Sequence, residues 1–183
     1  MPEQNQANKV IIRFMGDINP QTTNILINTI ENKIRENKND FLFLISSHGG
    51  DVPSGISIYN YLKNLSINIE THNFGIVESI ASLLYCCGSK RSSSKTASFL
   101  IHGINWNGGG DEKQINEVAK TLKTYREHIS DIISKNCNKS SKQIQKMMFN
   151  NSRLNAEEAK KIGLVDEIKE LNIDTNTEII SIG

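Results

Sequence analysis

The feature that most constrains the fold is a repeated alternation of short apolar runs with helical apolar stripes. Residues 10–14 (VIIRF) and 41–45 (FLFLI) are apolar runs of the length and composition typical of buried strands. Between them, Ile27, Ile30 and Ile34 recur at the spacing of one helix face. Strands that alternate with helices predict an α/β fold with a mostly parallel sheet and right-handed crossovers.

The same alternation continues toward the C-terminus. Further strands are predicted at 67–71, 97–101 and 164–165, a short buried helix at 79–87, and a long amphipathic helix from about 111 to 135. No linker divides the chain, so we expect a single domain over 1–183 with flexible tails at 1–9 and 172–183.

Charge and cysteine content exclude several classes of function. The 21 basic and 20 acidic residues leave a net charge of +1, which gives no electrostatic reason to expect nucleic acid or a membrane surface as a partner. The chain has no apolar run that could span a bilayer and its polar start does not resemble a signal peptide, so a cytoplasmic location is expected. The three cysteines lack the spacing of a disulfide framework or a zinc site. We therefore expect no metal and no cofactor.

Two glycine-marked turns follow predicted strands and carry the candidate chemistry. They lie at 46–50 (SSHGG) and 75–79 (GIVES), and both should reach the carboxyl edge of the sheet, where ligands bind in α/β folds. Ser79 at a helix start would have free backbone N–H groups beside it, and these favour an oxyanion. His102 ends a predicted strand at the same edge and could act as the base that a serine nucleophile needs.

Plainer interpretations of such residues remain open. A serine at a helix start often only caps the helix, and a histidine at a strand end is often a surface residue. His72 and His128 are expected to be surface residues, and His48 an exposed turn residue. Glu78, next to Ser79, is expected to be a solvated or packing carboxylate rather than an acid catalyst.

Four blocks of the sequence resemble the Clp protease proteolytic subunit family. In chain order they are 45–59 (ISSHGGDVPSGISIY), 75–88 (GIVESIASLLYCCG), 99–102 (FLIH) and 156–168 (AEEAKKIGLVDEI). Their order agrees with the family, and so does their spacing apart from a short deletion before His102. The resemblance implies an α/β, ClpP/crotonase-like fold of repeated β-α units with a long protruding handle helix.

The resemblance also implies a role for each site residue by its position. Ser79 matches the nucleophile and His102 the general base, and the backbone N–H groups of Gly50 and Ile80 match the oxyanion hole. The third catalytic position, usually aspartate, holds Asn151. Asparagine can orient an imidazole but supplies no charge, and an aspartate-to-asparagine change in a chymotrypsin-type triad costs ~10⁴ in turnover. Weak or conditional catalysis is therefore expected.

The implied function is that of a serine endopeptidase acting on short or unfolded peptides through an acyl-enzyme on Ser79. The family also implies a homo-oligomeric chamber, with heptameric rings stacked as a tetradecamer. Only about nine residues precede the first predicted strand, which leaves docking of an AAA+ unfoldase open.

Two alternatives stand beside the peptidase hypothesis. The first is a catalytically weak or inactive scaffold or regulatory subunit of a Clp-like assembly, because Asn151 replaces the aspartate and because Phe149 and Asn150 replace the family's ring-locking aspartate–arginine pair. The second is an acyl-CoA-processing enzyme of the related crotonase architecture. That architecture uses carboxylates, so the match of Ser79 and His102 to a serine–histidine pair argues against it.

Overall fold

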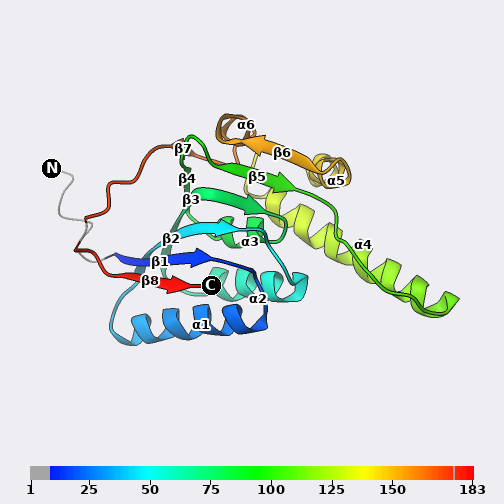
Figure 1. The fold of residues 1–183 in the computed structure, drawn as a ribbon, viewed down its shortest axis with the longest axis horizontal. Coiled ribbons are helices and arrows are strands. Elements are labelled where there is room, and N and C mark those ends of the chain that lie inside the picture. The colour runs from blue at the N-terminus through cyan, green and yellow to red at the C-terminus, as the bar shows by residue number, and fades with distance from the viewer. Residues whose placement is uncertain (1–8, 175) are drawn as a thin grey trace.

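The computed structural model describes residues 9–174 and 176–183, which form an eight-stranded sheet flanked by helices (Figure 1). The strand order is β6-β5-β3-β2-β1-β8, with β4 beside β3 and β7 beside β4. Every pair of strands is parallel except β5 and β6. The predicted α/β class with a mostly parallel sheet is thus confirmed.

The strands lie at the following positions in chain order: β1 Val10–Met15, β2 Asp40–Ser47, β3 Asn68–Glu78, β4 Lys90–Ser93, β5 Ser98–Ile101, β6 Ser152–Asn155, β7 Glu167–Ile168 and β8 Ile179–Ile182. The helices are α1 Pro20–Arg35, α2 Val52–Lys63, α3 Ala81–Tyr85, α4 Glu112–Ser134, α5 Ser141–Phe149 and α6 Ala156–Lys161.

Helix α1 shows how local sequence sets the boundaries of an element. Asn19 caps the helix by accepting a hydrogen bond from the Thr22 N–H, and Pro20 occupies the first turn, where its missing N–H costs nothing. The buried face of the helix carries Leu26 and Ile30. These side chains join the main core beneath the sheet, so burial of this face holds α1 in place.

The two faces of the sheet are covered differently. Helices α1, α2 and α3 lie along one face (Figure 1), and their apolar side chains share a core with Phe14 and Phe43 of the central strands. On the other face, Leu42 and Leu44 of β2 pack with Leu171 from the segment after β7. Alternate residues of the central strands therefore point either to the main core beneath the helices or to the smaller cluster on the opposite face.

Helix α4 is the predicted long helix, and it reaches outward from the sheet (Figure 1). The buried residues of α4 are Ile129, Ser130 and Ile133, all in its C-terminal third. Ile115 near its outer end is 49% exposed. The long helix is as expected from the sequence, whereas its use as a handle between subunits stays a prediction.

Several elements differ from the sequence prediction. The expected strand at 67–71 continues through Gly75 to Glu78, and the expected strand at 164–165 is displaced to Glu167–Ile168. Strands β4 and β6 were not predicted, because their sequences KRSS and SRLN lack the apolar alternation of a strand.

The two predicted tails have different outcomes. Residues 179–182, within the expected tail at 172–183, form β8 and pair with β1 in parallel. The expected tail at 1–9 lies outside the described residues except for Lys9, whose Nζ is 3.0 Å from a carboxylate oxygen of Glu70.

Candidate functional site

Ser79 sits on a strained turn between β3 and α3. Its φ is +55°, a left-handed conformation that is costly for a residue other than glycine. Its backbone N–H donates to the carbonyl oxygen of Leu100 on β5 at 2.8 Å, which ties the turn to the sheet. Strain of this kind, roughly 1–3 kcal/mol, persists where the surroundings enforce it, and it is concentrated at functional sites.

The two glycines after β2 pack directly against this turn. A Cβ on Gly49 would lie 2.8 Å from the Ser79 Cβ and 3.2 Å from the Ile80 nitrogen, and Gly49 has φ +99°. Ile18 holds the glycine segment, because its N–H donates to the Gly49 carbonyl and its own carbonyl accepts from the Asp51 N–H, both at 2.7 Å. Close approach and positive φ together require glycine at position 49.

Two backbone donors remain free beside Ser79. Within residues 9–174 and 176–183, no hydrogen bond uses the N–H of Gly50 or the N–H of Ile80. Gly50 has φ +142° and contacts the Ile18 carbonyl, so a side chain there would clash with backbone. Unpaired N–H groups next to a serine are what an oxyanion hole requires.

The sheet register brings His102 and Asn151 to the same edge as Ser79. Glu78 on β3 pairs with Leu100 on β5, so Ser79 and His102 both lie just beyond the ends of adjacent parallel strands. On the antiparallel strand β6, Ser152 pairs with Ile101, which places Asn151 next in register to His102. Asn151 has φ +50°, a conformation that asparagine tolerates well.

The structure places these three side chains at one edge without joining them. His102 is half-buried and Asn151 is exposed. Over the described part of the chain, no hydrogen bond links Ser79 to His102 or His102 to Asn151. Catalytic hydrogen bonds are often long or misaligned before substrate binds, so this geometry is compatible with a catalytic role.

Glu78 forms a network of polar contacts that the sequence alone did not indicate. Its Oε2 lies 2.7 Å from His48 Nδ1, and its Oε1 accepts from Arg153 Nη1 at 2.7 Å. The Glu78 side chain is only 11% exposed, whereas that of His48 is 75% exposed. Burial pushes the pKa of Glu78 upward, but the hydrogen bonds from His48 and Arg153 outweigh burial and leave the pKa below its ordinary value.

The expectation that His72 is a surface residue is wrong. The residue is 2% exposed, and its Nδ1 and Nε2 lie 2.8 and 3.1 Å from the hydroxyls of Ser92 and Ser94. Burial lowers the pKa of His72 to about 4, which keeps the ring neutral. The polar partners come from β4 and the residue after it, which were not predicted as part of the sheet. By contrast, His48 and His128 are exposed as expected.

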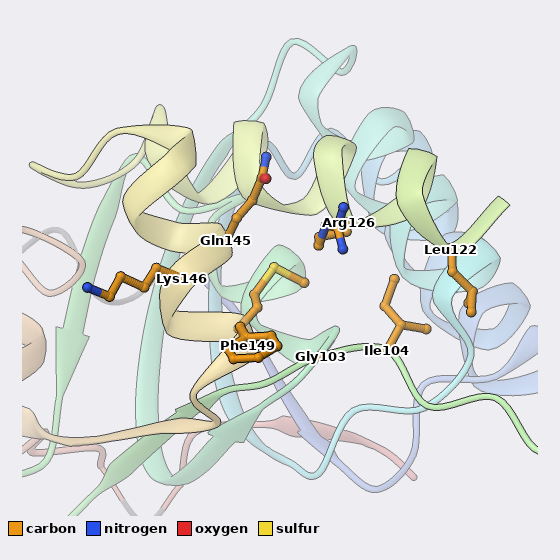
Figure 2. A pocket seen from close by; sticks show the side chains of 8 residues that line it. Gly103, Ile104, Leu122, Arg126, Gln145, Lys146 and Phe149 are labelled. Carbon is orange, nitrogen blue, oxygen red and sulfur yellow. The ribbon is translucent and has the colours of Figure 1, made fainter. Parts of the chain in front are cut away.

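A cavity of about 440 Å³ lies between the segment that follows β5 and helices α4 and α5 (Figure 2). Gly103 and Ile104, the residues after His102, form one side, and Phe149, two residues before Asn151, forms another. Its remaining wall comes from α4 and α5, through Leu122, Arg126, Gln145, Lys146 and Met148. The wall mixes apolar side chains with Arg126, Gln145 and Lys146, so the cavity could receive a side chain of a bound ligand.

Other site types find no support in the described residues. No group of three or more His, Cys, Asp or Glu side chains in residues 9–174 and 176–183 is arranged to hold a metal ion. Among the helices of that same portion, none combines the length and apolarity needed to cross a membrane.

A family model described as Clp protease matches residues 4–172. The match contains the Ser79 turn, the glycine segment, His102 and Asn151.

Proposed function

The chain belongs to the Clp protease family, and we propose that it is a serine endopeptidase with Ser79 as its nucleophile. Family membership implies serine peptidase activity in general. The observation that carries the assignment to Ser79 is its strained turn, which is packed against Gly49 beside two free N–H groups.

The proposed reaction has two halves. The Ser79 Oγ attacks the carbonyl carbon of a peptide bond while His102 accepts the hydroxyl proton, and His102 then protonates the departing amine as the C–N bond breaks. Water then attacks the resulting ester while His102 accepts one of its protons. His102 returns that proton to the Ser79 Oγ as the acyl C–Oγ bond breaks and the acid product leaves. The N–H groups of Gly50 and Ile80 stabilise the oxyanion in both halves, and a single such donor is typically worth ~2.7–4 kcal/mol.

Asn151 would serve as the third member of the triad. Its position next in register to His102 supports an interaction with the imidazole once substrate is bound. A neutral amide can accept the imidazole N–H but gives no charge stabilisation to imidazolium, so turnover should be low.

Short or unfolded peptides are the proposed substrates. The 440 Å³ cavity supports this class, because it has room for a peptide side chain and its wall includes Gly103, the residue after His102. The apolar part of its lining, including Leu122 and Met148, favours apolar side chains there.

Oligomeric assembly is the general expectation for the family, and a chamber of two stacked heptameric rings is the specific proposal. Helix α4 supports assembly, because its outer part buries no side chain and exposes Ile115 within this chain. An apolar stripe on a projecting helix is stabilised when it packs against another copy. Native mass spectrometry would measure the subunit number, and a monomer would contradict the proposal.

A second candidate function is that of a scaffold or regulatory subunit with weak or no catalysis. The specific observation behind it is the neutral and exposed Asn151 where the family usually has an aspartate. Such a subunit would assemble but would not cleave peptides by itself.

The deciding experiment is hydrolysis of a panel of fluorogenic short peptides by the wild type, Ser79→Ala and Ser57→Ala. Ser57 is an exposed serine on α2 whose hydroxyl donates to the Pro53 carbonyl of its own helix. Activity that disappears in Ser79→Ala and persists in Ser57→Ala supports the peptidase. A correctly assembled wild type without activity favours the scaffold subunit.

A further inference from the structure

The carboxylate of Glu78 joins three segments that are far apart in the sequence. Glu78 precedes Ser79, His48 precedes the Gly49–Gly50 segment, and Arg153 lies two residues after Asn151. Both carboxylate oxygens are used, each in a contact of 2.7 Å. One side chain next to the proposed nucleophile thus contacts the segment that carries Gly50 and the segment that carries Asn151.

The sheet register explains why these groups meet. Glu78 pairs with Leu100, and Leu100 pairs with Arg153, so the three residues lie side by side across β3, β5 and β6. Laterally paired residues point to the same face of a sheet. Arg153 therefore reaches Glu78 across Leu100, while His48 reaches it from the turn after β2.

We propose that Glu78 is a positioning residue, whose carboxylate holds the His48–Gly50 turn and the Asn151–Arg153 segment in fixed relation to Ser79. This inference rests on the proposed function of Ser79. Glu78 itself does not touch the reacting atoms; it acts through the two segments that it holds.

The electrostatic setting favours this role over that of an ordinary surface ion pair. Exposed pairs are worth little, because water screens them and both side chains are mobile. Here the partners His48 and Arg153 are exposed, but the carboxylate itself is largely buried, and hydrogen bonds to an ionised group are stronger in such surroundings. The Glu78 pKa below its ordinary value means that the ionised form, which both partners need, is the one favoured near neutral pH.

The first test does not depend on catalysis. Hydrogen–deuterium exchange is compared between the wild type, Glu78→Gln and a control variant, Glu167→Gln. The Glu167 carboxylate pairs with Lys169, and both residues are distant in the sequence from Glu78. Glu78→Gln should speed exchange several-fold in both 46–51 and 149–155, and the control should change neither. Unchanged exchange, or a change in only one of the two segments, would overturn the proposal.

A second pair of variants tests the Arg153 contact separately from the His48 contact. It also keeps the proposal testable if Glu78→Gln does not fold. Arg153 is 60% exposed, so Arg153→Met should fold. It should speed exchange in 149–155 but not in 46–51, and Arg153→Lys should restore most of the protection. Equal exchange in Arg153→Met and the wild type would contradict the role of this contact.

The kinetic test asks for a change in turnover rather than in binding. Displacing catalytic groups by about 1 Å can cost ~10²-fold, so Glu78→Gln should lower kcat roughly 10- to 100-fold while KM stays within about twofold. An unchanged kcat would overturn the proposal. A wild type with no activity and no reaction at Ser79 would instead contradict the proposed function, and the exchange measurements would still decide the role of Glu78.

Discussion

The two halves of the candidate site are held in different ways. The nucleophile half consists of Ser79 with Gly49 and Gly50, and it is held by backbone hydrogen bonds to Ile18 and Leu100 and by the close approach of Gly49 to Ser79. The base half consists of His102 and Asn151, whose side chains make no hydrogen bond to each other or to Ser79 in the described residues. His102 also begins a stretch without regular structure, 102–111, between β5 and α4.

This difference indicates which half of the candidate site can change its geometry when a substrate binds. If Ser79 and the N–H groups of Gly50 and Ile80 have their proposed roles, the proposed oxyanion donors are in place before substrate arrives, and such preorganised donors contribute strongly to acyl transfer. In the proposed function, the base half would still adjust when a peptide binds or when other subunits pack against α4. Variants in each half should therefore have different signatures.

Loss of the base should have the largest effect on activity. Positioned general bases contribute typically ~10²–10⁴-fold, so His102→Ala should lower kcat/KM in that range without changing the urea midpoint of unfolding. His128→Ala, at an exposed position on α4, is the matched control. Peptide hydrolysis that is the same in both variants would exclude His102 as the base.

A variant in the nucleophile half should lose activity and stability together. In Gly49→Ala the new Cβ would meet the Ser79 Cβ at 2.8 Å, and alanine is strained at φ +99°. We expect about 10²-fold lower kcat/KM and a loss of roughly 1–3 kcal/mol in the free energy of unfolding. Gly109→Ala, where nothing lies within 4 Å of the added Cβ, should match the wild type in both assays. Wild-type behaviour of Gly49→Ala would show that this half is not tightly held.

A charge added to the base half should raise activity. Asn151→Asp supplies the carboxylate that stabilises imidazolium, and a gain of about 10-fold or more in kcat is expected. Because position 151 is exposed, the substitution should leave stability nearly unchanged. Absence of any gain in peptide hydrolysis would count against a charge-deficient triad.

The smallest expected effect concerns the cavity wall. Leu122→Trp should fill part of the hollow in Figure 2 and raise KM a few-fold for peptides with a bulky apolar residue at the cleavage position. Peptides with a small residue there should be little affected. If KM changes equally for both sets of peptides, the cavity does not select the side chain at the cleavage position.

Much of this site could be predicted from the sequence because it is built from strand ends. The apolar runs before Ser46 and His102 mark strands, and the glycines at 49 and 50 mark a turn that only glycine can make. Parallel strands end at a common edge, so Ser79 and His102 could be expected there together. The site roles of all these residues stay proposals until they are measured.

The features that the sequence did not predict depend on contacts between residues that are far apart in the chain. The partners of Glu78 lie 30 and 75 positions away, and no local pattern links them. Burial of His72 depends on the serines of β4, a polar strand that lacks the periodicity of a sheet element. Likewise, β8 is held by pairing with β1 from the other end of the chain.

Covalent labelling of Ser79 tests the central claim most directly. The wild type and Ser79→Ala would be treated with a serine-reactive fluorophosphonate, and the modified residue would be located by peptide mass spectrometry. The account predicts one label per chain, at Ser79, with no label in Ser79→Ala and slower labelling in His102→Ala. A folded and assembled wild type that takes up no label, or takes it up at another serine, would contradict the account.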